Sequence, residues 1–169
     1  MKKVVLNIAT SLDGFIAGPN GEIDWLFTDG DYGLSDFFKT IDSTLIGNKT
    51  YQLMLKMGEN GYSGMTNYVF TRKPTESKSD NVIFVSDNIV EFVRQLKDKD
   101  GKNIWLVGGG EIANVFFAAS LVDEMILSVH PIILGDGIPL FKRSKRIDYK
   151  LTDCIKYPSG LVQLLYRLS

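Results

Sequence analysis

Three consecutive glycines, Gly108, Gly109 and Gly110, separate two apolar runs of the chain. Residues 103–107 predict a strand and residues 111–119 predict a helix, so the triplet joins a strand to the start of a helix. Backbone N–H groups at a helix start bind anions, and glycine lets a phosphate approach the backbone closely. We therefore expect the triplet to bind a phosphate. The alternative is a tight turn in which glycine only supplies a positive φ.

The triplet also fits the dinucleotide-binding pattern G-x-G-x-x-A, through Gly108, Gly110 and Ala113. A Rossmann domain needs an acidic residue about 20 residues further on, at the end of the next strand. Residues 128–130 hold no carboxylate, and too little sequence follows the triplet for a standard dinucleotide-binding half. We therefore exclude a Rossmann domain.

Two further strand exits carry residues that suit phosphate. Residues 47–50 combine glycine, a cation and a hydroxyl, and Thr71 is followed by Arg72 and Lys73. The planar fork of arginine suits a phosphate and favours NADPH over NADH, because NADPH carries an additional 2′-phosphate. Carboxyl ends of parallel strands meet at one edge of a sheet, so these segments and the glycine triplet together indicate a nucleotide site. Each segment alone is also compatible with a solvated turn.

His130 and Cys154 are the single histidine and the single cysteine of the chain. Because they are too few and too far apart in sequence for a zinc site, we predict no metal. Any Ser-His-Asp or Cys-His nucleophile would have to use His130, which precedes Pro131 on an apolar strand. We expect His130 to be a packed, hydrogen-bonded residue instead.

Composition restricts the class of protein that must position these residues. The chain has 169 residues, of which 44% are hydrophobic, and this suits a single domain that spans residues 1–169. Its net charge of −1 gives no reason to expect a nucleic acid or a membrane as partner. No apolar run reaches the length of about 20 residues that a membrane span needs. The single cysteine indicates a reducing, cytoplasmic location.

Strand and helix patterns alternate along the chain. We expect strands at residues 2–10, 43–46, 67–71, 82–85 and 103–107, an extended stretch at residues 124–133 that is kinked by Pro131, and a closing hairpin of residues 150–156 and 161–168. Helices are expected at residues 50–57, 88–97 and 111–119, and another begins with Ser35 as its cap. The order predicts an α/β fold with a central mixed, mostly parallel sheet, helices on both faces and a C-terminal antiparallel hairpin. Residues 11–24 predict a loop that forms a lid, in which Asp13 and Gly14 shape a turn.

The whole chain resembles the dihydrofolate-reductase-like proteins, and among them the stand-alone relatives of the reductase domain of riboflavin biosynthesis. The segments that carry the resemblance are residues 9–17 (ATSLDGFIA), Asp24 and Trp25, residues 47–50 (GNKT), the glycine triplet and residues 131–141 (PIILGDGIPLF). They cover nearly the full length in the same order. The resemblance therefore implies a dihydrofolate-reductase-like fold, NADPH as cofactor and a homodimer.

The resemblance also implies a role for each matching position. The nicotinamide and its ribose would contact Ala9, Ile16 and Asn20; the pyrophosphate would contact Gly47, Asn48, Lys49, Thr50, Gly109, Gly110, Glu111 and Ile112; the 2′-phosphate would contact Thr71 and Arg72; and the adenine would contact Ser86.

The implied reaction is hydride transfer from NADPH to a small heterocycle, either a pteridine or an aminopyrimidine precursor of riboflavin. Three departures leave the substrate open. Met65 stands where dihydrofolate reductases carry an arginine for folate, Asn48 stands where they carry a phosphate-binding arginine, and no arginine lies between Gly47 and Tyr68 to hold a ribose phosphate. The alternative function is a non-catalytic NADPH-binding sensor or interaction module on the same fold.

Asp31 and Trp25 are the candidate catalytic residues on the substrate side. Asp31 could accept hydrogen bonds from ring N–H groups or promote protonation, and Asp36 is the alternative acid. Trp25 could stack near the substrate. These residues are also compatible with ordinary roles, as charges at a helix start and as packing.

Overall fold

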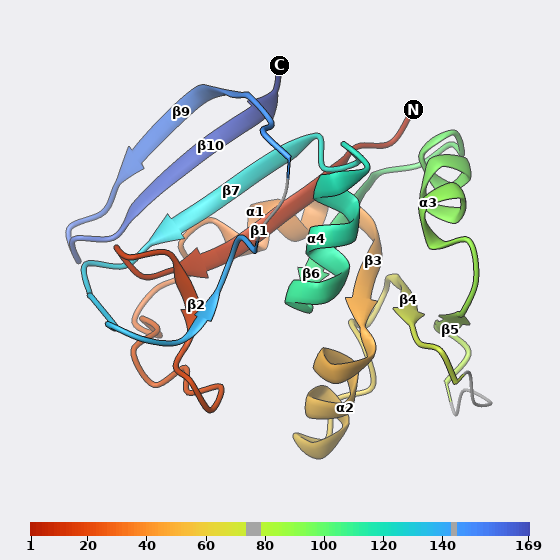
Figure 1. Ribbon diagram of the computed structural model, residues 1–169, viewed down its shortest axis with the longest axis horizontal. Coiled ribbons are helices and arrows are strands. Elements are labelled where there is room, and N and C mark those ends of the chain that lie inside the picture. Colours follow the sequence, from red (N-terminus) through yellow and green to blue (C-terminus); the bar gives the residue numbers. More distant parts are fainter. Residues whose placement is uncertain (74–78, 143–144) are drawn as a thin grey trace.

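The computed structural model describes residues 1–73, 79–142 and 145–169. Within these residues, eight strands form one twisted sheet (Figure 1). In their order across the sheet, they are β5 (Val82–Val85), β4 (Thr66–Phe70), β3 (Ile41–Gly47), β6 (Asn103–Gly108), β1 (Val4–Thr10), β7 (Glu124–Val129), β10 (Val162–Leu168) and β9 (Tyr149–Lys156).

The direction of the strands divides the sheet into two parts. The strands from β5 to β7 in this order all run parallel to one another. Beyond β7, strand β10 is antiparallel to β7, and β9 is antiparallel to β10. The expected mixed, mostly parallel sheet with a C-terminal antiparallel hairpin is therefore confirmed.

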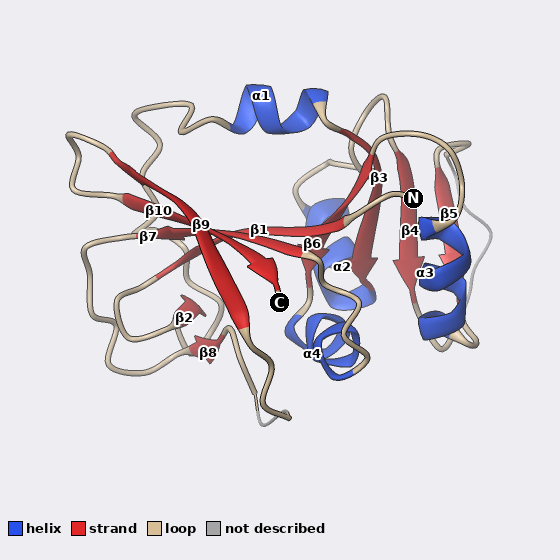
Figure 2. Cartoon of the chain, turned by 90° about the horizontal axis from the view of Figure 1, so that it is seen from above, coloured by secondary structure: helices blue, strands red, loops and turns tan. Residues whose placement is uncertain are grey.

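Helices cover both faces of the sheet. They are α1 (Leu34–Lys39), α2 (Asn48–Lys56), α3 (Ile89–Lys97) and α4 (Gly110–Ala118). Neighbouring residues of a strand point to opposite faces. Leu6 and Leu106 accordingly pack with Phe116 of α4, whereas Val5 and Trp105 pack on the other face, which α1 covers. Figure 2 shows α1 and α4 on opposite sides of the sheet. None of the helices in the described ranges has the length and hydropathy of a membrane-spanning segment.

The segment of residues 11–24 is more ordered than a plain loop. It contains the short strand β2 (Phe15–Ala17), which pairs antiparallel with β8 (Ile138–Pro139). The sequence analysis missed both strands. Strands of two or three residues carry no periodic pattern, and they form here only because two distant parts of the chain meet.

Asp13 has the structural role that was expected for it in the lid turn. Its carboxylate accepts hydrogen bonds from the N–H groups of Leu134 at 3.1 Å and Gly135 at 2.8 Å. Gly14, the next residue, has a φ of 85°, which glycine adopts without strain. Asp13 therefore fixes both its own turn and the loop that precedes β8.

The start of α1 differs from the expectation, whereas the end of β7 agrees with it. The cap residue of α1 is Gly33, with a φ of 80°, and the backbone N–H of Ser35 donates to the carboxylate of Asp31 at 3.1 Å. The expectation that Ser35 caps this helix was therefore wrong. Strand β7 ends at Val129, just before the expected kink at Pro131, because proline has no N–H with which to continue the ladder.

Candidate functional site

The segments that the sequence singled out for phosphate lie along one edge of the sheet. Strands β3 and β6 are neighbours and end at Gly47 and Gly108. The chain continues from β3 through α2 to β4, and from β6 through α4 to β7, in opposite directions across the sheet. Because both crossovers are right-handed but run in opposite directions, α2 and α4 lie on opposite faces of the sheet. Both helices therefore begin at the point where β3 and β6 end. Ligands of open α/β sheets bind at such a point, outside the carboxyl ends of the strands.

Two glycines allow the backbones to come close at this point. A Cβ atom on Gly47 would lie 3.3 Å from the carbonyl oxygen of Gly108 and 3.3 Å from the Cα atom of Gly109. Gly108 and Gly109 also have positive φ values, of 138° and 95°. The alternative role of supplying a positive φ therefore accounts for two glycines of the triplet.

Neither a close backbone contact nor a positive φ explains the glycine at position 110. It is the first residue of α4, its φ lies outside the left-handed region, and a Cβ atom there would have no described neighbour within 4 Å. Glycine costs up to about 1 kcal/mol relative to alanine within a helix. The open space beside Gly110 gives an approaching phosphate access to the N–H groups at the start of α4.

An ion pair connects the first turns of the two helices. The ammonium of Lys49, at the start of α2, lies 2.8 Å from the carboxylate of Glu111, at the start of α4. The hydrogen bond and the charge of Lys49 hold the pKa of Glu111 below its ordinary value, and the charges of Lys142 and Arg72 add to this effect. Glu111 is therefore a carboxylate at the positive end of a helix, paired with Lys49 and under the influence of two further positive charges.

The exits of β4 and β5 lie side by side at the same edge. The N–H of Thr71, just after β4, donates to the carbonyl of Val85 at the end of β5 at 3.0 Å. The hydroxyl of Ser86, the next residue, donates to the carboxylate of Asp87 at 2.8 Å. Arg72 is exposed and close enough to Glu111 to influence its pKa. The structure thus brings Thr71, Arg72 and Ser86 to the edge that carries the triplet.

The three residues implied for the nicotinamide end are less close together. Ala9 lies near the end of β1, which neighbours β6, and Ile16 lies on β2 against the main core. Asn20 is exposed, and its side chain and N–H both donate to the carboxylate of Glu22, at 2.8 and 2.9 Å. Ala9 is therefore at the edge of the site, whereas Asn20 is held within its own loop.

Both candidate acids have partners within the chain. The carboxylate of Asp31 accepts the hydroxyl hydrogen of Ser35 at 2.6 Å, and this hydrogen bond lowers the pKa of Asp31. Asp36 forms an ion pair with Lys39 at 2.7 Å and is 85% exposed. In this conformation both carboxylates support the start of α1.

His130 anchors the loop before α1 to the end of β7. Its Nε2 atom accepts the backbone N–H of Phe27 at 3.2 Å, while its Nδ1 atom lies 3.1 Å from the carbonyl of Ser128. These partners fit a neutral ring that carries its hydrogen on Nδ1. The ring of Trp25 meets the imidazole edge-on, at 5.2 Å between centroids. His130 is 4% exposed, so the expectation of a packed, hydrogen-bonded histidine is confirmed.

An aromatic cluster on the α1 face of the sheet was not identified from the sequence. Trp105 of β6 contacts the rings of Phe37, Phe38 and Tyr62, at centroid distances of 5.6, 5.4 and 4.6 Å, and Met65 packs against the same cluster. Burial raises the pKa of Tyr62 to about 12. Trp105 and Phe37 are buried in this cluster, whereas the rings of Phe38 and Tyr62 are half-buried. The only sequence signal was the position of Trp105 on a strand that ends at the glycine triplet.

No group of three or more metal-ligating side chains occurs in the part of the chain that the structure describes. The single cysteine, Cys154, is exposed on β9.

Residues 2–163 match the RibD C-terminal domain. Two uncharacterized proteins of Bacillus subtilis (strain 168) are similar over most of their length. YyaP is 40% identical over 179 residues, which cover 98% of this chain and 94% of YyaP. YwjB is 42% identical over 144 residues, which cover 83% of each protein.

Solved structures agree with this match. A protein named for riboflavin biosynthesis from Shewanella sp. PV-4 has a TM-score of 0.86 at 26% identity, and 99% of each chain is covered. A diaminohydroxyphosphoribosylaminopyrimidine deaminase/5-amino-6-(5-phosphoribosylamino)uracil reductase from Thermotoga maritima has a TM-score of 0.75 at 19% identity, covering 99% of this chain and 57% of that one. Dihydrofolate reductase from Enterococcus faecalis, complexed with NADP(H), has a TM-score of 0.69 at 18% identity, covering 99% and 96%. The fold is dihydrofolate-reductase-like, and the chain belongs to the family of the RibD C-terminal domain.

Proposed function

We propose that this protein is an NADPH-dependent reductase that transfers a hydride to a small heterocycle of the pteridine or riboflavin-precursor aminopyrimidine class. Membership in the RibD C-terminal domain family supports a reductase-type function. The observation that carries the proposal is the open position at Gly110, beside the close contact of Gly47 with Gly109. A dinucleotide pyrophosphate binds where backbone N–H groups are accessible in this way.

NADPH would supply the hydride, and the chain would bind and orient it. Lys49 and Thr50 would bind the pyrophosphate together with the backbone of residues 109–112, and Arg72 would bind the 2′-phosphate beside Thr71. The related fold of Enterococcus faecalis dihydrofolate reductase, a complex with NADP(H), supports this choice of cofactor.

The substrate ring would lie against the half-buried rings of the aromatic cluster on the α1 face, Phe38 and Tyr62. Trp105 of this cluster stands on β6, the strand that ends at the glycine triplet, so a ring there and a nicotinamide near Ala9 would occupy neighbouring strands. The carboxylate of Asp31 would accept hydrogen bonds from ring N–H groups of the substrate in place of the hydroxyl of Ser35, or promote protonation of the ring. Trp25 would stack near the substrate from the loop that His130 anchors. Hydride transfer needs such positioning and the exclusion of water.

A non-catalytic NADPH-binding module is the second candidate. The observation in its favour is that Asp31 and Asp36 both have partners within the chain, Ser35 and Lys39. A module of this kind would bind NADPH without turning over a substrate.

Ligand binding and turnover test both candidates. NADPH at 100 times its Kd stabilises a binding protein by about 2.7 kcal/mol, which raises the Tm of a chain of this size by about 5–10 °C. We expect this shift together with oxidation of NADPH in the presence of a pterin, flavin or aminopyrimidine from a panel. A shift without turnover supports the module. No shift and no quenching of tryptophan fluorescence at millimolar NADPH or NADH excludes both candidates.

The proposal includes a homodimer in a reducing, cytoplasmic setting. The outer strand β9 exposes Leu151 and Cys154, whose cross-strand partners Tyr166 and Leu164 lie on the same face of the sheet. A second copy covering this apolar face would be expected to double the mass measured by light scattering after size exclusion. A monomer at micromolar concentration contradicts this part of the proposal.

A further inference from the structure

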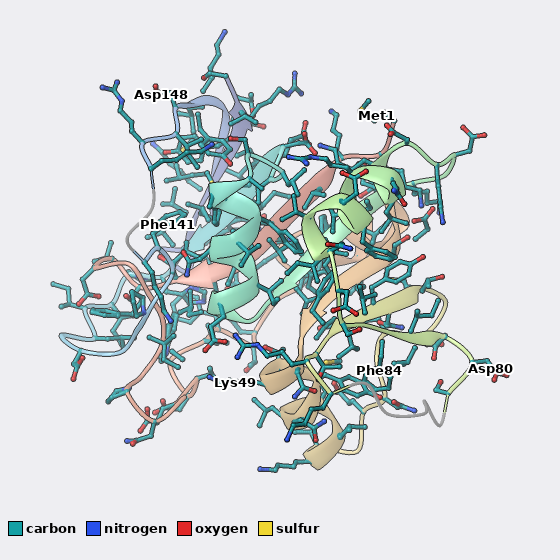
Figure 3. All side chains as sticks on the ribbon, turned by 45° about the vertical axis from the view of Figure 1, so that its right-hand side comes forward. Met1, Lys49, Asp80, Phe84, Phe141 and Asp148 are labelled. Carbon is teal, nitrogen blue, oxygen red and sulfur yellow. The ribbon has the colours of Figure 1, made fainter. Side chains whose placement is uncertain are left out.

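Glu111 occupies a position where an anion is expected to bind. It follows Gly110 in the first turn of α4, and its carboxylate lies 2.8 Å from the ammonium of Lys49. Lys49 comes from the start of α2 and is labelled in Figure 3. The backbone of α2 and that of α4 approach each other directly beside this pair, through Gly47 and Gly109. The carboxylate therefore lies at the point where the two helix starts meet.

A third segment reaches the same place after β8. The N–H of Lys142 donates to the side-chain oxygen of Asn114 at 3.2 Å, and the amide of Asn114 donates to the carbonyl of Gly110. The backbone of Lys142 is thereby fixed to the first turns of α4. Lys142, Lys49 and Arg72 come from three separate segments, and the charges of all three act on the carboxylate of Glu111.

We propose that Glu111 is a built-in competitor for the dinucleotide phosphates: in the free protein its carboxylate occupies a cation cluster of Lys49, Arg72 and Lys142, and binding transfers these cations to phosphate. This inference rests on the proposed function. It adds Lys142 to the phosphate-binding residues and gives Glu111 a role opposite to that of a ligand contact.

The exchange is feasible because the ion pair is exposed. The side chains of Lys49 and Glu111 are 84% and 67% exposed, and ion pairs of this kind contribute little to stability. Once a phosphate has replaced Glu111 as the partner of Lys49, the carboxylate of Glu111 remains close to the negative charge of the phosphate. Like charges a few ångströms apart near a protein surface repel each other, so Glu111 weakens binding and accelerates release.

Two substitutions that break the same ion pair separate this role from a structural one. Glu111→Gln removes the competing charge, and we expect the Kd for NADPH to fall about three- to tenfold. Lys49→Gln removes a cation, and we expect the Kd to rise by a similar factor. Lys142→Gln is expected to raise the Kd as well. A purely structural ion pair would change the Kd in the same direction for Glu111→Gln and Lys49→Gln.

A matched control is the exposed ion pair of Arg146 with Asp148, at 3.2 Å, whose side chains are 88% and 68% exposed. Asp148 lies at the opposite end of the molecule from Lys49 (Figure 3), so Asp148→Asn changes the net charge equally and should leave the Kd unchanged. An equal fall in Kd for Asp148→Asn and Glu111→Gln would reduce the effect to net charge and overturn the inference.

The measurement is isothermal titration of the purified proteins with NADPH and, separately, with inorganic pyrophosphate. Wild-type binding of NADPH with no gain in Glu111→Gln overturns the inference and leaves the proposed function intact. If no variant binds NADPH, the proposed function fails. Tighter binding of pyrophosphate to Glu111→Gln than to the wild type would then still support the competitor role, and equal or weaker binding would overturn it.

Discussion

Gly110→Ala tests the phosphate site with a change of a single methyl group. In the free protein the added Cβ atom meets nothing within 4 Å among the described residues, and the backbone of Gly110 already has a φ outside the left-handed region. Alanine is favoured over glycine by up to about 1 kcal/mol within a helix, and a first helical residue gains part of this, about 0.5 kcal/mol. The Tm of the free variant should therefore rise by about 1–2 °C.

The same methyl group should oppose NADPH. A pyrophosphate that contacts the N–H groups at the start of α4 needs the space that the Cβ atom fills, so we expect at least a tenfold loss of affinity, or about 1.4 kcal/mol. The variant should thus be more stable without ligand and less stabilised by it. Thermal unfolding with and without NADPH, together with quenching of tryptophan fluorescence, measures both effects.

Gly47→Ala is the comparison. Its Cβ atom would lie 3.3 Å from the backbone of Gly108 and Gly109, so this variant should lose stability, by about 1–3 kcal/mol, as well as affinity. A stabilised Gly110→Ala protein that binds NADPH as tightly as the wild type would refute the placement of the phosphate at the triplet. A destabilised Gly110→Ala protein would show that the fold at the start of α4 requires glycine, independently of any ligand.

Three further predictions concern single side chains. Arg72→Ala should raise the Kd for NADPH tenfold or more and leave that for NADH nearly unchanged, measured by fluorescence titration; an equal loss for both removes Arg72 from the 2′-phosphate. Burial raises the pKa of Asp42, but hydrogen bonds from Lys2, from the hydroxyl of Ser43 and from a backbone N–H outweigh this effect, so the folded pKa is lowered. The contribution of Asp42 to stability is therefore present above about pH 4 and is lost as the pH falls through the folded pKa. Asp42→Asn should lower the free energy of unfolding in urea by about 2 kcal/mol at pH 7, a value between those of exposed and buried ion pairs. This loss should become smaller below about pH 4, and a loss that does not depend on pH contradicts the ionic role. His130→Phe keeps a ring but leaves the N–H of Phe27 without its acceptor, so it should lower the free energy of unfolding by about 1–2 kcal/mol and change the tryptophan emission. If both values are unchanged, the hydrogen bond of His130 does not hold the loop before α1.

The sequence predicted the sheet and the edge of the site because these depend on local patterns. The expected strand at residues 82–85 coincides with β5, and the expected helix at residues 88–97 differs from α3 by one residue. The apolar spacing within each run is enough for such elements. The rule that parallel strands end at one edge then placed the exits of β3, β4 and β6 together.

The parts that could not be predicted depend on contacts between residues distant in the sequence. His130 and Phe27 are 103 positions apart, and nothing near either residue indicates their hydrogen bond. The aromatic cluster draws Phe38 from α1, Tyr62 from a loop and Trp105 from a strand. The same reason explains the missed pairing of β2 with β8 and the contact of Lys142 with Asn114 of α4.

The pairing of β2 with β8 joins two segments that are far apart in the sequence into one small antiparallel sheet. Because Asp13 also bonds the N–H groups of Leu134 and Gly135, the chain after β1 and the chain after β7 cannot swing independently. A motion of one segment that keeps these contacts must carry the other segment with it. Hydrogen exchange at Phe15 and at Leu134 should therefore rise and fall together.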